Sequence, residues 1–348
     1  MKFIHIADVH LGVKPDKDKP WAEKRERHSW QAFAQVIKRA QEEKTDLLLI
    51  AGDLFHRQPL LAELKEVSYQ LGKLTHTQVV MIAGNHDYLS PDSYYRTFVW
   101  PEHVHFLKKE EIEYIELPMI RTRVYGMSYW HREITEEKYR DIKVEEGSFI
   151  NILLAHGGDE KHIPFRVNDF LKSPFQYVAC GHIHKPMELL ENRVVMAGAL
   201  VPSDSNDVGA HGYFCGELSL DGGNVEFQPL KYCEYVPLNL KVNEDLTNGE
   251  LEEFVRSRIS QSPEYQIFKI MLNGLWDAAV PLDTKRLSEI DRVVQVVNLC
   301  HPDYDFERLK IQYENQLVGK FISAMEALPQ NEVTKKALYY GMEALMEE

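Results

Sequence analysis

The first two hundred residues alternate short apolar runs with longer amphipathic segments. Helical periodicity over residues 23–43 and 59–74 predicts two helices among the first strands. This alternation is typical of a layered α/β fold. Seven apolar runs have the length and bounding polar residues of β-strands: residues 2–7, 46–51, 79–82, 124–127, 150–154, 177–180 and 194–197.

The pattern changes after Pro229. Residues 236–312 predict a small α+β capping domain, with helices at 248–259 and after Pro281 and a strand at 266–272. Residues 313–348 predict C-terminal helices broken near Pro329, with apolar side chains at helical spacing. We therefore expect a main α/β domain over 1–235, a cap over 236–312 and a helical segment over 313–348. That segment either folds back on the cap or docks onto a helical partner.

Clusters of Asp, Asn, His and Gly follow nearly every strand of the main domain. In open α/β sheets ligands bind beyond the carboxyl ends of strands, so we expect these clusters to converge. Each cluster alone is ambiguous, because turns and helix N-caps use the same residue types. Together they predict one site with seven donor side chains: Asp8, His10, Asp53, Asn85, His156, His182 and His184.

The chemistry of these donors predicts divalent metal ions. Carboxylate, amide and imidazole groups without thiolates suit octahedral ions such as Mn²⁺ or Fe²⁺ better than structural zinc. Two carboxylates against two divalent ions leave a surplus of positive charge, which would hold a phosphodiester anion and a metal-activated hydroxide. We expect two ions, Mn²⁺ first, with Mg²⁺, Fe²⁺ and Zn²⁺ as alternatives.

Five motifs resemble, in order and spacing, those of the calcineurin-like metallophosphoesterases. They are Asp8-Val9-His10, Gly52-Asp53, Gly84-Asn85-His86-Asp87, His156-Gly157 and Gly181-His182-Ile183-His184. The resemblance implies a layered β-sandwich flanked by helices, with two ions bridged by Asp53. The first ion would also take Asp8, His10 and His184, and the second Asn85, His156 and His182. His86 would stabilise the transition state or protonate the leaving oxygen, oriented by Asp87.

Within that superfamily the chain resembles the SbcD-type branch of DNA repair exonucleases. The resemblance rests on residues 3–12, which end in Leu11-Gly12, and on Phe55-His56 after the second motif. It implies a homodimeric DNA exonuclease or endonuclease that works with an SbcC-type SMC-like ATPase in double-strand-break repair. His56 would then border the site and position DNA, although it could also simply pack within its loop.

One segment departs from the branch. A Gly-Ser-Pro segment usually lies beside the metals, but here residues 198–203 read Gly-Ala-Leu-Val-Pro-Ser. The departure leaves the preference for polymeric DNA open. A stand-alone phosphodiesterase or phosphatase on nucleotides or other small phosphoesters is the alternative. A scaffold that has lost catalysis is a third hypothesis, which the intact donor set disfavours.

Charge bears on the choice between DNA and small substrates. The formal net charge is −14, and residues 1–234 and 235–348 carry −7 each, so neither part is basic. If DNA is the substrate, bound cations, a local patch or a partner must supply the positive field. The acidic balance favours the small-substrate alternative.

Cysteine usage and apolar runs indicate the compartment. The four cysteines are scattered without a Cys-x-x-Cys pair, which favours free thiols in a reducing compartment. The apolar stretch near the N-terminus is short, contains His5 and ends at Asp8, unlike a signal peptide. No apolar run is long enough to cross a bilayer, so we expect a cytoplasmic protein without membrane association.

Overall fold

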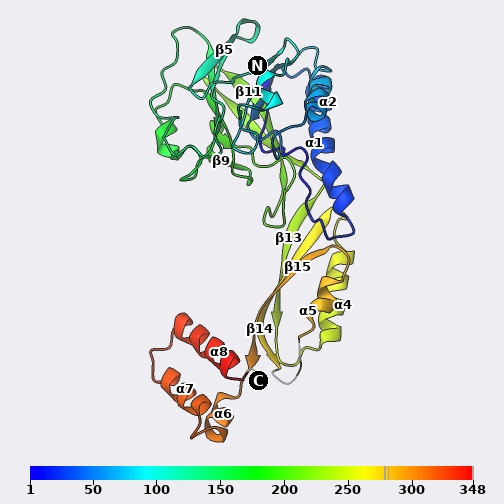
Figure 1. Ribbon diagram of the computed structural model, residues 1–348, viewed down its shortest axis with the longest axis vertical. Coiled ribbons are helices and arrows are strands. Elements are labelled where there is room, and N and C mark those ends of the chain that lie inside the picture. The colour runs from blue at the N-terminus through cyan, green and yellow to red at the C-terminus, as the bar shows by residue number, and fades with distance from the viewer. Residues whose placement is uncertain (278–279, 281, 347–348) are drawn as a thin grey trace. The chain divides into compact units, whose positions relative to one another are not determined.

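The computed structural model describes residues 1–277, 280 and 282–346 (Figure 1). By the distribution of contacts the chain divides after Tyr235 into two compact units. Among the helices of the described residues, none is both long and apolar enough to cross a membrane.

The first unit contains two six-stranded sheets. In the first sheet β1 to β4 are parallel, and β11 and β12 extend it antiparallel on the other side of β1. Across the sheet the strands are, in order, β12 (Gly222–Leu230), β11 (His211–Ser219), β1 (Lys2–Ile6), β2 (Leu47–Ala51), β3 (Gln78–Ile82) and β4 (Val104–Phe106). The parallel strands direct their carboxyl ends to one edge.

The second sheet is also parallel at its centre. Strands β6, β7, β8 and β10 run parallel, and β5 and β9 close the two edges antiparallel. Across the sheet the strands are, in order, β5 (Glu113–Leu117), β6 (Thr122–Gly126), β7 (Ile150–His156), β8 (Tyr177–Gly181), β10 (Val194–Met196) and β9 (Met187–Leu190). The strands predicted within the main domain are confirmed in both sheets.

The two sheets pack face to face through alternating side chains. Phe3 lies in the core between them and contacts Tyr177 edge to face, with ring centroids 4.8 Å apart. Ile4 and Ile6 belong to the core on the opposite face of the first sheet. Each such buried side chain contributes roughly 1.5–3 kcal/mol of transfer free energy. The layered sandwich expected from the sequence is confirmed.

Helices cover the outer face of the first sheet. The helices α1 (Ala22–Glu42) and α2 (Leu61–Leu71) pack there, as Figure 1 shows, and confirm the two predicted helices. Short elements also occur: α3 (Tyr94–Thr97) and the 3₁₀ turns η1 (Pro118–Ile120) and η2 (Val167–Phe170). The outer face of the second sheet is covered mainly by irregular chain that buries Tyr139, Phe170 and Phe175.

The second unit has a three-stranded sheet with its own core. Its strands follow the order β13-β14-β15, and β14 and β15 are parallel. Val255, Ile270 and Val293 are fully buried in this unit. The elements in chain order are β13 (Glu234–Val242), α4 (Asn248–Ser260), β14 (Gln266–Asp277), α5 (Thr284–Ser288) and β15 (Val293–Asp303).

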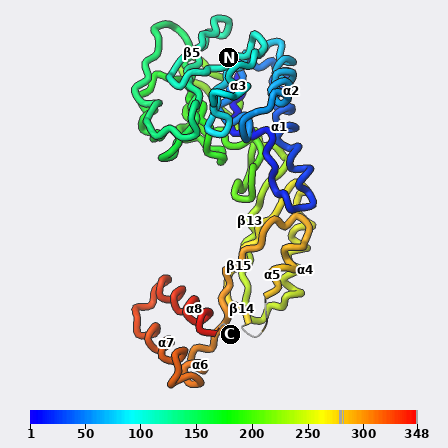
Figure 2. The backbone as a smooth tube through the Cα atoms, in the orientation of Figure 1, coloured from blue at the N-terminus to red at the C-terminus, as the bar shows by residue number. Residues whose placement is uncertain are grey.

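Within the described residues, β15 is followed by helices only, whose path can be traced in Figure 2. They are α6 (Phe306–Gln312), α7 (Leu317–Glu326) and α8 (Glu332–Met346). Val318, Ile322 and Met342 form a small buried cluster between them. The two C-terminal helices predicted on either side of Pro329 are confirmed. The roles assigned to 236–312 as a cap and to 313–348 as a docking segment remain predictions.

Candidate metal centre

The seven predicted donors converge beyond the carboxyl ends of the strands. Asp8, His10 and Asp53 lie in tight turns after β1 and β2, with φ angles of 48°, 48° and 49°. Non-glycine residues rarely adopt this left-handed backbone, and it costs on the order of 1 kcal/mol or more at each position. Backbone hydrogen bonds from Asp8 to Gly52 (3.2 Å) and from His10 to Asp53 (3.1 Å) join the two turns.

One donor group contains Asp8, His10 and His184. Their candidate ligand atoms lie within 4.8 Å of one another. The Nδ1–H of His184 donates to the Asp207 carboxylate at 2.9 Å, so Nε2 is the ring nitrogen left to bind a metal. This Nε2 lies 3.0 Å from Nε2 of His10. A cation between these atoms would satisfy both imidazoles.

A second donor group contains Asn85, His156 and His182. His156 donates Nδ1–H to the Ala51 carbonyl (2.9 Å), so Nε2 is the ring nitrogen left to bind a metal, and it lies 2.9 Å from Asn85 Oδ1. His182 donates Nε2–H to Asp159 (2.7 Å) and directs Nδ1 at the same amide oxygen, 3.1 Å away. Three electron-pair donors thus face one another, the arrangement that a metal ion satisfies.

Asp53 lies between the two groups. Its Oδ2 is 3.9 Å from Nε2 of His10 and 3.5 Å from Nε2 of His156. Burial alone would raise the pKa of Asp53, but the adjacent His156 and His10 outweigh burial and hold it well below its usual range. Asp53 is therefore an ionised carboxylate placed to bridge two cations.

The electrostatics of the site favour added positive charge. Burial raises the pKa of Asp8 to about 6, and the charge of Asp53 contributes in the same direction. Burial lowers the pKa of His184, but Asp207 and Asp8 outweigh this effect and raise it to about 9. Among the described residues, the ion-pair partners of Asp53 are histidines rather than lysines or arginines. Divalent cations would neutralise these buried carboxylates.

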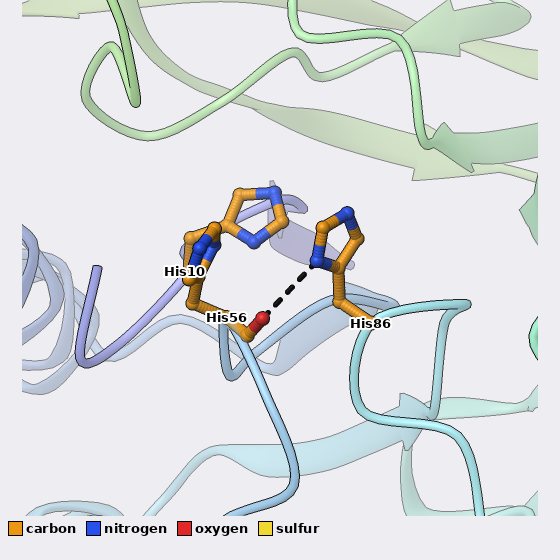
Figure 3. Close-up of side chains that lie close together, drawn as sticks. All are labelled: His10, His56 and His86. Atoms are coloured by element: carbon orange, nitrogen blue, oxygen red, sulfur yellow. Dashed lines mark hydrogen bonds between the residues drawn. The ribbon is translucent and has the colours of Figure 1, made fainter. Parts of the chain in front are cut away.

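His86 and His56 lie beside the first donor group (Figure 3). The His86 backbone N–H donates to Asp53 Oδ1 (2.8 Å), and its ring Nδ1 bonds the His56 carbonyl at 3.1 Å. The two rings stack with centroids 5.3 Å apart, and the His86 ring is 4.8 Å from that of His10. Nε2 of His86 is therefore the ring nitrogen that remains for a substrate.

Asp87 has a different neighbourhood from the one expected. Its carboxylate accepts the backbone N–H groups of Gly84 (2.8 Å) and Phe55 (3.1 Å), whereas the ring of His86 is held by the His56 carbonyl. Burial raises the pKa of Asp87 to about 7, with the charge of Asp53 adding to the effect. Asp87 thus fixes the backbone of the two loops that carry Asp53 and Asn85.

The residues with this geometry match a family model. Residues 1–186 match the model described as calcineurin-like phosphoesterase. The chain belongs to this family. Membership implies divalent metal ions at the centre, and the convergence of carboxylate, amide and imidazole donors fits them.

Several curated relatives are similar to parts of this chain. An uncharacterised metallophosphoesterase YhaO of Bacillus subtilis is 28% identical over 247 residues, covering 66% of this chain and 60% of the relative. The DNA double-strand break repair protein Mre11 of Methanocaldococcus jannaschii is 28% identical over 269 residues, covering 69% and 70%. Mre11 of Archaeoglobus fulgidus is 40% identical over 95 residues, which is 26% of this chain and 20% of the relative.

Relative to the family motifs, the structure adds residues that the sequence did not single out. Asp159 and Asp207 contact His182 and His184, and the His162 ring lies against that of His182 with centroids 4.4 Å apart. Asp207 lies shortly after residues 198–203, which depart from the expected pattern, so no motif marks it. Asp159 follows the predicted ligand His156 by three residues, and this closeness in sequence is the feature that could have pointed to a role of Asp159 at the metal site.

Several arginines of the first unit that could contact a phosphate have protein partners instead. Arg121 and Arg123 lie at the start of β6, at the opposite end of the parallel strands from the site. Arg123 pairs with Glu116 at 2.8 Å, and Arg57 pairs with Glu63 at 2.9 Å. Arg96 lies over the Trp130 ring, 4.2 Å from its centroid.

Proposed function

We propose that this phosphoesterase is a DNA nuclease that hydrolyses phosphodiester bonds with two divalent ions, Mn²⁺ foremost. The observation that carries the proposal is the position of the ionised Asp53 between two sets of converging donors. Asp8, His10 and His184 would complete one site, and Asn85, His156 and His182 the other. Bound there, the ions would supply a nucleophilic hydroxide and neutralise charge on the phosphoryl oxygens.

The protein groups would position the substrate and move a proton. With Nδ1 held by the His56 carbonyl, the His86 ring keeps Nε2 directed away from its loop. In the protonated ring this nitrogen donates to the leaving oxygen or to a phosphoryl oxygen, a role worth about 10²–10⁴ in rate. His56, stacked on His86, limits the ring's rotation and borders the DNA, as the resemblance implies.

DNA is favoured over a small phosphoester by the names of the relatives. Two of the relatives described above are called DNA double-strand break repair proteins. The second unit after Tyr235 also exceeds what a minimal phosphatase core needs. The net charge of −14 favours the small-substrate candidate, a phosphodiesterase or phosphatase on nucleotides.

A paired assay separates the two candidates. Linear duplex DNA and bis-p-nitrophenyl phosphate are incubated side by side with the full chain and Mn²⁺, using Asp53→Ala as the background control. The nuclease proposal expects both substrates to be cleaved by the wild type. Cleavage of the small diester alone would support the small-substrate candidate, and cleavage of neither would reject both.

The C-terminal helices are the proposed docking element for an SMC-like ATPase. Their apolar residues divide into a buried set, Val318, Ile322 and Met342, and an exposed set that includes Leu317, Val333 and Tyr340. An acidic nuclease could use the positive surface of such a partner to hold DNA. A chain truncated after Tyr313 should retain metal and hydrolyse the small diester but lose co-purification with the ATPase. Unimpaired co-purification would place the docking site elsewhere.

Homodimerisation is proposed on the helix α2. Leu64, Val67 and Leu71 pack on the sheet, whereas Leu61 and Tyr69 are exposed and available to a second copy. Light scattering at micromolar concentration should give the mass of a dimer, and replacing Leu61 and Tyr69 with Glu should give a monomer. A wild-type chain that stays monomeric at this concentration contradicts the proposal.

A further inference from the structure

We infer that Asp159 and Asp207 are positioning residues, each holding one histidine of one metal site. Asp159 would fix His182 for the site that contains Asn85, and Asp207 would fix His184 for the site that contains Asp8. The inference rests on the proposed two-ion function and extends it, because neither carboxylate belongs to the expected ligand set. It predicts that the metal affinity of each site can be lowered without changing the affinity of the other.

Asp207 is held rigidly where it meets His184. Its Oδ2 accepts from His184 Nδ1 (2.9 Å) and from the backbone N–H (2.8 Å) and hydroxyl (2.7 Å) of Ser203. The loop is anchored in turn by the buried Arg25, which donates to the Pro202 carbonyl at 2.7 Å. The Asp207 side chain is 13% exposed, so its charge acts on His184 with little screening by solvent.

Asp159 is fixed by its own turn. Its Oδ1 accepts the backbone N–H groups of Lys161 (2.8 Å) and His162 (2.9 Å), while Oδ2 accepts Nε2–H of His182 at 2.7 Å. The His162 ring also bonds this carboxylate at 2.9 Å. The Asp159 side chain is 44% exposed, so solvent screens it more than Asp207, and we expect a smaller effect from its loss.

The two carboxylates select different ring nitrogens for the metals. Asp159 engages Nε2 of His182, which leaves Nδ1 to face Asn85. Asp207 engages Nδ1 of His184, which leaves Nε2 to face His10. Such outer partners fix the tautomer and ring orientation and raise ligand basicity, and their loss costs about 10–100-fold in metal affinity.

The test is a Mn²⁺ titration of the metal-free full chain by calorimetry, with electron paramagnetic resonance to distinguish paired from single ions. Asp159→Asn and Asp207→Asn should each weaken one of two binding steps about tenfold or more and leave the other unchanged. At Mn²⁺ concentrations that fill only the unaffected site, the paramagnetic resonance spectra of these variants should be those of single rather than paired ions. Matched controls are Glu160→Gln and Asp204→Asn, neighbouring exposed carboxylates, which should bind as the wild type does.

Double variants assign each carboxylate to its histidine. Asp207→Asn should have no further effect on Mn²⁺ binding in a His184→Ala chain, and Asp159→Asn none in a His182→Ala chain. The crossed pairs should be additive. Thermal unfolding of the metal-free single variants measures any loss of loop stability, because both carboxylates also accept backbone N–H groups. A general loss of stability would weaken both binding steps, whereas a positioning role weakens one step and leaves the other unchanged.

Several results would overturn the inference. Wild-type binding steps in both Asn variants would reject it while leaving the two-ion function intact. Additivity of Asp207→Asn with His184→Ala would show that the carboxylate acts elsewhere. Asp159, His162 and His182 also offer ligand atoms within 4.8 Å of one another. If the wild type bound a third ion and Asp159→Asn lost it, Asp159 would be a metal ligand rather than a positioning residue. A wild type that binds fewer than two ions would reject the proposed function and this inference together.

Discussion

His86 separates chemistry from metal binding at the scale of a single residue. Its backbone N–H, rather than its ring, contacts Asp53, so a change of side chain leaves that hydrogen bond in place. We expect His86→Ser to keep two Mn²⁺ per chain and to slow hydrolysis of bis-p-nitrophenyl phosphate by roughly a hundredfold or more. The matched control is His131→Ser, which changes an exposed histidine paired with Glu110. Undiminished turnover in His86→Ser would remove His86 from the reaction.

Asp87 contributes stability through two backbone amides. In Asp87→Ala the N–H groups of Gly84 and Phe55 lose their acceptor in a buried environment, and each unsatisfied group costs about 1–3 kcal/mol. We expect the free energy of unfolding of the metal-free chain, measured in urea, to fall by about 2 kcal/mol or more. Asp87→Asn keeps one acceptor oxygen and should lose less. Equal stability of Asp87→Ala and wild type would contradict this role.

The site residues differ in how far the sequence could predict them. The seven donors lie at or directly after the carboxyl ends of buried apolar strands, so the strand pattern predicts that they converge. All of them carry carboxylate, amide or imidazole groups that can bind a divalent metal, so their residue types predict the chemistry of the site. Asp159 and Asp207 are ordinary loop carboxylates, and their contacts with His182 and His184 depend on loop conformations that no local pattern specifies. The role of Asp87 also depends on tertiary structure, because its second partner, Phe55, is in another loop.

At the scale of elements, the turn after β3 packs so closely on the turn after β2 that only glycine fits at position 84. A Cβ there would collide with Asp53 Oδ1 and lie 2.6 Å from Nε2 of His156. Gly84→Ala should therefore displace both side chains and lower the bound Mn²⁺ below one ion per chain by elemental analysis. Gly249→Ala is the control, because the nearest atom to a Cβ there is 3.9 Å away. Full metal content in Gly84→Ala would show that the loop can shift without cost.

The central parallel strands could be predicted from the sequence, whereas the edge strands and the antiparallel strand β11 inside the first sheet could not. Buried parallel strands are nearly continuous apolar runs, such as Leu47–Ala51, and these stand out from the flanking polar residues. Strands β4 and β9 are short, and β12 (Gly222–Leu230) mixes glycine, proline and polar side chains with few apolar ones. Pairing with a neighbouring strand, rather than local pattern, places these segments in the sheets.

At the scale of the whole molecule, the first unit contains all seven proposed metal donors and its own hydrophobic cores. All seven donors and the sandwich core precede Tyr235. A fragment ending at Tyr235 should therefore fold, bind two Mn²⁺ and hydrolyse bis-p-nitrophenyl phosphate close to the rate of the full chain. Its cleavage of linear duplex DNA should fall if the second unit or a partner bound there holds the DNA. Equal DNA cleavage by fragment and full chain would remove the second unit from substrate binding.

The bridging position of Asp53 is the claim on which the two-ion account depends most directly. The decisive measurement is the number of Mn²⁺ ions bound per chain, determined by elemental analysis after equilibrium dialysis, for the wild type and Asp53→Ala. We expect two ions in the wild type and loss of both in the variant, because Asp53 lies between His10 and His156 and serves both sites. Retention of two ions by Asp53→Ala would contradict the account.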